Sequence, residues 1–477
     1  MRSRSLRAML LAGLCALPEI VHAEPTPGDA TASVQVAADP PPCTGPASDR
    51  APDPRCDETL DGRVTAGLSA DLAVQRAALA VPRFVVRGLF WPVVETTDVV
   101  EHNHLIDWMH VLLTTDDGLV GVRPVINYST SFLPSGGARF FYRRLPGPGS
   151  EVAGLFETAG PAVMLGRLEL RSPTRIGLVL SGIWDRRDDR LFAGNGPNSM
   201  ADLLAAGQGL GRYGSDNFAA QLRWSRPLPG KLIAHAQGDL QWRDYTAADV
   251  HSGSSVAELY GLPADTCAAQ GMAAPCVDER QLPGFERGMR IVHEGGGLGI
   301  GLRDLGREGA GASLIVDGTF AEGFAGDPSR HLTLSAETVL AVGTSNRAFL
   351  LRGRAAMVER LGDAPVPFEE LISPSGAAGM RGFPEGRFRG ESGLVGTAEY
   401  RWYVASYLDA SVFTDLGTVA GRQFAGISWD RWFPTFGIGF RRFMTEGPYW
   451  EAKVLDGIQL AYAPDNGFRI LLSMAGF

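Results

Sequence analysis

From about residue 118 onward, apolar and polar residues alternate in short segments that are separated by Gly, Pro, Asn and Asp. Alternation with a period of two predicts β-strands that have one apolar face. Clear examples are 120–129, 163–170, 176–184, 217–224, 232–242, 313–320, 331–340, 349–358, 397–404, 410–416, 436–443 and 458–462, followed by a last segment at 468–477. We count about fifteen such segments, and because bacterial single-chain barrels have an even number of strands, we predict about sixteen, with the unseen strand near 190–215.

The segment 397–404 shows what the two faces of such a strand carry. Glu399 and Arg401 lie on one face, and Tyr400 and Trp402 lie on the other. A charged face opposite an aromatic face suits the wall of a membrane barrel, between the lumen and the lipid. A soluble antiparallel sandwich would alternate in the same way, but the features of the two chain ends favour the barrel.

The first 23 residues predict a secretory signal peptide. They contain a basic start at Arg2, Arg4 and Arg7, a short apolar stretch at 8–17, and a small-residue cleavage site at 21–23. The apolar stretch is too short to span a bilayer as a helix. Cys15 would suit a lipoprotein signal, but Leu14 stands before it where a small residue is expected.

Two further segments precede the predicted strands. Residues 24–80 are rich in Pro, Ala, Asp and Thr without a clear period, which predicts a disordered periplasmic tail. Residues 83–115 form an amphipathic helical pattern with Trp91 and Trp108. This segment suits a membrane interface or a barrel mouth, and equally an ordinary helix that faces a core.

The chain ends on an aromatic residue, Phe477, as is typical of outer-membrane barrels. Its phase is unusual, because Phe468, Ile470 and Leu472 share one face of the last strand and Phe477 falls on the other. A bulge near residues 475–476 would restore the phase. We therefore interpret Phe477 as the terminal strand signal.

Composition narrows the possible partners. The net charge of −9 argues against a nucleic-acid partner. After the signal peptide, the cysteines form two local pairs in polar loops, Cys43 with Cys56 and Cys267 with Cys276. In an exported chain these pairs predict two loop disulfides, and their spacings do not fit a C-x-x-C metal knuckle.

Patterns that would indicate catalysis or a metal site do not stand out. The sequence has neither G-x-S-x-G nor H-E-x-x-H, and the glycine-rich stretch 295–301 alternates as a strand does and does not open a helix. His102, His104 and His110 decorate the polar side of the amphipathic segment, and four later histidines, His235, His251, His293 and His331, show no pattern. We expect no enzyme activity, no metal and no cofactor.

The most specific stretch is 373–421. It contains the tetrapeptide Met380-Arg381-Gly382-Phe383, then Glu399-Tyr400-Arg401, then 413–417 with the pattern F-x-D-x-G. This ordered set resembles the BamA/TamA superfamily of outer-membrane barrels, also called the bacterial surface antigen family, although Met380 stands where that family has Val or Ile. The resemblance covers roughly 85–477. The 24–80 stretch is too short and irregular for a periplasmic POTRA module, so we expect a short member that lacks these modules.

The resemblance implies that the long loop folds back into the lumen as a plug, where Arg381 meets Glu399 and Asp415 on the inner wall. The alternation supports this assignment, because it places Glu399 on the charged face. The five fixed donors of an arginine suit two carboxylates, and Gly379 and Gly382 permit a tight turn around it. The alternative is a surface loop with a solvated arginine.

By resemblance, the chain is expected to insert proteins into, or translocate them across, the bacterial outer membrane. The implied partners are outer-membrane lipid, unfolded outer-membrane or secreted client proteins, and a separate periplasmic partner chain. Two other function classes stay open. One is a plugged or gated pore or a lipid-handling channel, and the other is a structural surface protein that binds through external loops such as 246–288.

Overall fold

The computed structural model describes residues 113–115, 117–247, 253–272, 274–301, 309–344, 347–405, 408–442 and 457–474. The chain divides into two compact units, Met1–Gly88 and Leu89–Phe477, and all described residues belong to the second. The predicted signal peptide, the tail, the amphipathic segment up to residue 112, Cys43, Cys56 and Phe477 lie outside the described residues.

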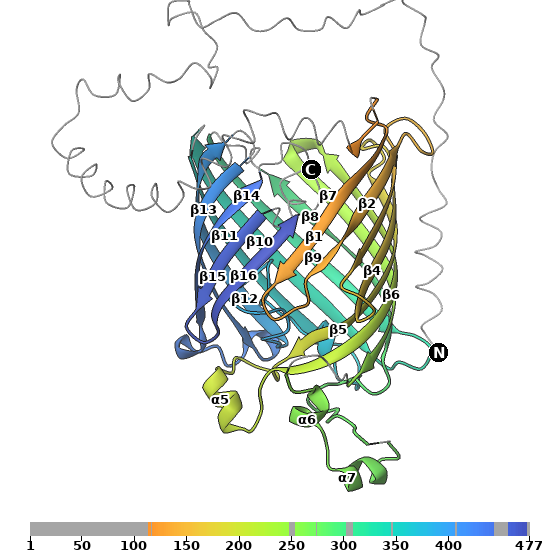
Figure 1. The fold of residues 1–477 in the computed structure, drawn as a ribbon, viewed down its shortest axis with the longest axis vertical. Helices are drawn as coiled ribbons and strands as arrows, with labels where there is room; N and C mark the ends of the chain where they lie inside the picture. The colour runs from red at the N-terminus through yellow and green to blue at the C-terminus, as the bar shows by residue number, and fades with distance from the viewer. Residues whose placement is uncertain are drawn as a thin grey trace, which may run out of the picture. The chain divides into compact units, whose positions relative to one another are not determined.

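The described residues form a closed antiparallel barrel of sixteen strands, as the sequence predicts. Each strand pairs with its neighbours along the chain, and β1 pairs with β16 to close the barrel (Figure 1). The strands are β1 (Val120–Ser129), β2 (Ser135–Arg143), β3 (Glu151–Thr158), β4 (Val163–Arg171), β5 (Leu178–Phe192), β6 (Gly211–Leu228), β7 (Leu232–Thr246), β8 (Met289–Gly301), β9 (Gly309–Gly323), β10 (Arg330–Thr344), β11 (Arg347–Arg360), β12 (Ser392–Ala405), β13 (Leu408–Ala420), β14 (Phe433–Arg442), β15 (Gly457–Ala463) and β16 (Gly467–Met474).

The predicted position of the unseen strand was wrong. Residues 190–215 hold the end of β5, the short helix α5 (Met200–Ala205) and the start of β6. The strands absent from the clear sequence examples include β2 and β3. In β2, Phe141 points inward beneath the Arg123 guanidinium while its neighbour Phe140 is exposed on the outside. Because an aromatic residue lies on each face, the alternation is lost from the sequence.

Short helices lie in the loops at one end of the barrel (Figure 1). They are α5, α6 (Val256–Tyr260), α7 (Ala264–Ala269) and the 3-10 helices η3 (Phe368–Glu370), η4 (Arg422–Phe424) and η5 (Trp429–Arg431), while η2 (Pro229–Lys231) joins β6 to β7. Among the described residues, none of the helices is both long enough and apolar enough to cross a bilayer.

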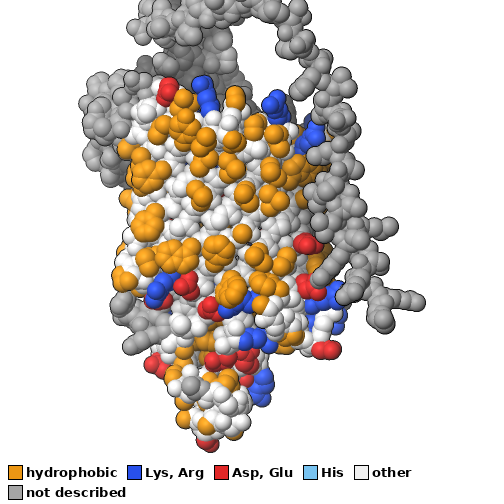
Figure 2. Space-filling model, turned by 90° about the vertical axis from the view of Figure 1, so that its right-hand side faces the viewer, with side chains coloured by type: hydrophobic (Ala, Val, Ile, Leu, Met, Phe, Trp, Pro, Cys, Tyr) orange, Lys and Arg blue, Asp and Glu red, His pale blue; other side chains and the backbone are white. Residues whose placement is uncertain are grey.

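The outer wall of the barrel is apolar. Figure 2 shows hydrophobic side chains spread over the wall and charged side chains gathered toward its ends. Outward residues such as Phe140, Leu168 and Phe218 are about half exposed or more, whereas Glu157 and Glu169 face inward and are buried. Closed barrels with an apolar outer band are the form in which β-strands cross a bilayer. The expectation of an outer-membrane barrel is therefore confirmed.

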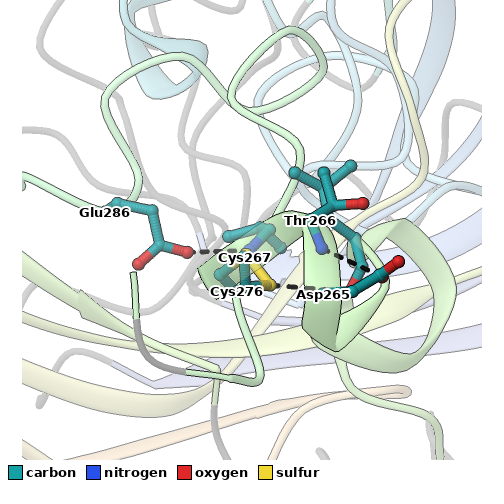
Figure 3. Close-up of a disulfide and its surroundings, with 7 residues drawn as sticks. Asp265, Thr266, Cys267, Cys276 and Glu286 are labelled. Carbon is teal, nitrogen blue, oxygen red and sulfur yellow. Dashed lines mark hydrogen bonds between the residues drawn. A yellow bond between two sulfur atoms is a disulfide. The ribbon is translucent and has the colours of Figure 1, made fainter. Parts of the chain in front are cut away.

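The loops at the helical end share a small core of their own. Its buried members come from strand ends, from α6, from the β7–β8 loop after α7 and from η3, and they are Phe192, Tyr213, Val256, Tyr260, Val277, Leu282, Phe285 and Phe368. Cys267 and Cys276 form a disulfide in the β7–β8 loop (Figure 3). Beside it, the Glu286 carboxylate accepts a hydrogen bond from the backbone of Val277 at 2.7 Å. Through Phe368, this loop core holds one end of the connection between β11 and β12, which carries the candidate site.

Candidate functional site

The segment 361–391 connects β11 to β12 and folds against the inner side of the barrel wall; we call it the inner loop. Met380, Phe383 and Phe388 of this loop are fully buried and pack with Val419 and Phe433. These two partners belong to β13 and β14, so the loop tip lies against the lumen face of the sheet. An apolar contact of this kind holds the loop inside the barrel, where charged side chains otherwise predominate.

Glycines shape the tip of the inner loop. Gly376 has a φ of +102°, a left-handed conformation that favours glycine. The backbone N–H of Gly376 donates to the carbonyl of Phe383 at 3.1 Å, which closes the turn. At Gly382, an added Cβ would lie 2.8 Å from Thr435 and 2.9 Å from Ala463. Gly382 therefore allows the tip to approach β14 and β15 closely.

This turn delivers Arg381 to two buried carboxylates. Its Nε and one terminal nitrogen donate to the two oxygens of Asp415 at 3.0 and 2.7 Å, and its backbone N–H donates to Asp415 at 3.0 Å. The other terminal nitrogen donates to Glu399 at 3.0 Å. The Arg381 side chain is 5% exposed, Glu399 is 5% exposed and Asp415 is 0% exposed. The arrangement is a buried fork of charge-assisted hydrogen bonds that water does not screen.

Further contacts hold the fork in place. The Arg381 guanidinium lies over the ring of Phe413, 3.3 Å from its centroid. Burial alone would lower the pKa of Arg381, but Asp415 and Glu399 raise this pKa above its ordinary value. Arg381 therefore carries its positive charge between the two carboxylates.

Glu399 and Asp415 also bind partners on the barrel wall. Arg401 and Arg441 donate to Glu399 at 2.6 and 3.0 Å, and the Thr397 hydroxyl donates to Asp415 at 3.0 Å. Three arginines thus surround the Glu399 carboxylate. The wall residues come from β12, β13 and β14, so the fork connects the inner loop to three adjacent strands.

Another arginine, Arg469 of β16, connects the inner loop to the place where β1 and β16 close the barrel. Arg469 donates to the carbonyl of Arg381 at 3.1 Å and to the carbonyl of Phe383. Its other terminal nitrogen donates to the Ser129 hydroxyl and, at 3.3 Å, to the carbonyl of Thr130. The guanidinium of Arg469 therefore binds the loop tip and the end of β1 at the same time.

The closure itself, which we call the seam, is the pairing of β1 with β16. Among the described residues, which end at Met474, its register contains four residue pairs, from Ile126 with Met474 to Ser129 with Leu471. Side chains add to it, because Ser473 donates to Asn127 at 2.8 Å and the Ile470 backbone donates to the Thr130 hydroxyl at 2.9 Å. By comparison, β1 pairs with β2 over eight residues.

The structure brings Arg381, Glu399 and Asp415 together, as the sequence-based assignment placed them. Arg401 and Arg441 were not predicted as residues of this site, although the alternation puts both on the charged face of their strands. Phe413 was predicted only as part of the F-x-D-x-G pattern, and Arg469 was not predicted. Arg469 is far from the motif in sequence, and only closure of the barrel brings it beside Arg381.

No family model matches the sequence, and no curated protein matches it significantly. Among solved structures, the chain is similar to BamA from Haemophilus ducreyi lacking POTRA domains 1–3, with 13% identity, a TM-score of 0.48, and coverage of 75% of this chain and 70% of that one. It is also similar to CdiB from Acinetobacter baumannii, with 14% identity, a TM-score of 0.43, and coverage of 74% and 59%. CdiB from Escherichia coli is similar too, with 12% identity, a TM-score of 0.44, and coverage of 74% of this chain and 63% of that one. The chain thus spans less than two thirds of either CdiB chain, and at these scores its function has to be inferred from its own residues.

Proposed function

We propose that this chain inserts proteins into, or translocates them across, the bacterial outer membrane by reversible opening of the seam. The observation that carries the proposal is Arg469, which belongs to β16 and binds both the tip of the inner loop and the end of β1. A shift of the loop tip would remove two acceptors from Arg469 and weaken its hold on β1. Loop position and seam stability are thereby coupled.

An opened seam would present two strand edges with unpaired backbone groups. Edges of this kind pair readily with another extended chain. A client strand that adds to β1 or β16 would satisfy these groups inside the bilayer, where an unpaired group is costly. The free energy of client folding then drives the reaction, and the proposal includes neither a cofactor nor a catalytic residue.

The Arg381 fork would keep the loop inside the lumen while the seam opens. The described ion-pair partners of the Arg381 guanidinium lie on β12 and β13, Arg441 of β14 also binds Glu399, and none of these three residues is on a seam strand. Opening therefore does not require a break in the buried ion pairs. Client proteins and outer-membrane lipid are the partners in this proposal, together with a separate periplasmic chain that recruits clients.

A plugged or gated pore is the alternative, and the charged lumen beside β2, β3 and β4 favours it. There, Arg139 pairs with Glu151 at 2.8 Å and Arg167 pairs with Glu169 at 2.7 Å, away from the inner loop. Such groups line aqueous channels in other barrels. In this alternative the loop gates ion flow and the seam stays closed.

Proteoliposomes separate the two functions. The chain from Glu24 onward is refolded into liposomes, and the insertion rate of an unfolded small barrel is measured against empty liposomes. We expect the chain to accelerate insertion, and Arg469→Ala to accelerate it further, because that change removes the bonds between Arg469 and the end of β1 that hold the seam closed. If the chain does not accelerate insertion but gives ion conductance that rises in Arg381→Ala, the proposal is wrong and the gated pore is correct.

A further inference from the structure

Away from the Arg381 fork, the barrel brings together two histidines that the sequence leaves far apart. His293 of β8 and His331 of β10 are the register partners of the same residue, Ala321 of β9, and all three side chains are buried. The small methyl group of Ala321 leaves room for the two rings to lie edge to face, with centroids 6.4 Å apart. No sequence pattern links these two histidines, because the register of the barrel strands, and not their spacing in the sequence, places them side by side.

Glu370 of the inner loop completes the cluster. Its Oε2 atom lies 3.1 Å from the Nε2 atom of His293 and 3.4 Å from the Nε2 atom of His331. Glu370 is held in place by its neighbours in η3, because Phe368 is fully buried in the loop core and Glu369 pairs with Arg243. The carboxylate is therefore directed at the two rings before any ligand binds.

The hydrogen bonding of His293 orients its free nitrogen toward the centre of the cluster. Its Nδ1 atom lies 2.8 Å from Asp239 on β7, so a proton on Nδ1 is bound by the carboxylate. In the neutral ring, the Nε2 lone pair then faces the lone pairs of Glu370. Two acceptors at this distance need a proton or a metal ion between them, and a carboxylate behind a histidine is the usual outer partner of a metal ligand.

The spacing fits a small divalent ion. One ligand atom from each of His293, His331 and Glu370 lies within 4.8 Å of the others. In a tetrahedral zinc site with bonds of about 2.0–2.2 Å, ligand atoms lie roughly 3.4 Å apart, close to the observed 3.1 and 3.4 Å. Two imidazoles and one carboxylate suit zinc and related transition metals, whereas Ca²⁺ and Mg²⁺ prefer oxygen ligands.

We propose that His293, His331 and Glu370 form a binding site for a divalent transition metal of the zinc class. The site would leave one coordination position for water. It would tie the inner loop to β8 and β10, whereas the Arg381 fork ties it to β12, β13 and β14. Metal binding would thus give the loop a second anchor on another part of the wall. This inference does not depend on whether the barrel inserts clients.

Zinc binding by the refolded full barrel tests the proposal. The protein is stripped with a chelator, incubated with zinc, desalted and assayed for bound zinc, with cobalt absorption of the wild type as an independent report of tetrahedral geometry. We expect His331→Gln to bind one zinc fewer per chain than the wild type. Asp239→Ala should bind this zinc roughly 10-fold or more weakly, because it loses the outer partner of His293.

His235→Gln is the matched control. His235 also faces the lumen and pairs with a carboxylate, Asp317, but it lies outside the cluster. The His235→Gln variant should bind as much zinc as the wild type. Both His235→Gln and His331→Gln keep the histidines of the N-terminal region. Glu370→Gln repeats the test from the loop side if His331→Gln does not fold. Equal zinc in the wild type and His331→Gln, or no zinc in the wild type, would overturn the proposal.

Discussion

The seam and the opposite wall of the barrel are held together in different ways. Over the residues that the structure describes, the seam between β1 and β16 has four residue pairs, whereas β9–β10 and β10–β11 each have fourteen. The cohesion of the wall therefore comes from a long ladder of backbone hydrogen bonds, and separation of two wall strands requires the loss of many of these bonds together. The seam relies in addition on individual side chains, among them Asn127, Ser473 and Arg469.

This difference indicates where the barrel can open. A typical hydrogen bond contributes about 0.5–1.5 kcal/mol net, so the few side-chain hydrogen bonds of the seam can break one at a time without loss of the fold. The fourteen residue pairs between neighbouring wall strands cannot separate in this way. The inner loop contacts both the wall and the seam. Arg381 binds Glu399 of β12 and Asp415 of β13, and the carbonyls on either side of Gly382 accept hydrogen bonds from Arg469 of the seam.

The largest effect is expected for Arg381→Ala. This change leaves Glu399 and Asp415 buried without their shared cation, and removal of one partner from a buried ion pair costs about 3–5 kcal/mol. The free energy of unfolding, measured by urea titration in lipid, should fall by that amount, and ion conductance should rise as the loop loosens.

Arg352→Ala is the control for this prediction. Arg352 forms an ion pair with Glu337 at 2.8 Å on the barrel wall, but its side chain is 42% exposed. Its loss should cost less than about 1 kcal/mol. Unchanged stability and conductance in Arg381→Ala would remove the idea that the fork anchors the loop.

Arg469→Ala should have the next largest effect, and this effect should be local. Arg469 donates to two loop carbonyls and to two groups of the β1 end, and a hydrogen bond to a charged group is worth about 1.5–3 kcal/mol. Amide hydrogen exchange should accelerate at Thr130 and Ile470, while β9 and β10 keep their protection. Equal acceleration in both regions would show that the seam is not a separate weak point.

Gly382→Ala should give a smaller effect. The added methyl group would meet Thr435 and Ala463 within 2.9 Å, and overpacking of this kind costs about 1–3 kcal/mol. Gly154→Ala on β3 is the matched control, because its Cβ would meet no atom within 4 Å. Thermal unfolding of the two variants measures the difference, and equal values would contradict the close approach of the loop tip to β14 and β15.

The strand pattern and the motif around Arg381 could be predicted from sequence because each depends on local spacing. The alternation of Glu399 with Tyr400 follows directly from the two faces of one strand. The strand β2 was missed because Phe140 and Phe141 put an aromatic residue on each face. Arg469 and the pair of His293 with His331 could not be predicted, since their contacts arise from closure and register.

A reversible lock on the seam tests the central claim most directly. Asn127 and Ser473 are paired across the seam and face the lumen, so Asn127→Cys with Ser473→Cys, in a chain that carries Cys43→Ser and Cys56→Ser, would join the two strands. Thr319→Cys with Thr333→Cys places the same lock on the β9–β10 wall. The insertion rate of an unfolded client barrel is then measured in proteoliposomes, oxidised and reduced. We expect the oxidised seam lock to reduce the rate to that of empty liposomes, reduction to restore it, and the wall lock to have no effect. An oxidised seam lock that accelerates insertion as well as its reduced form would contradict the account.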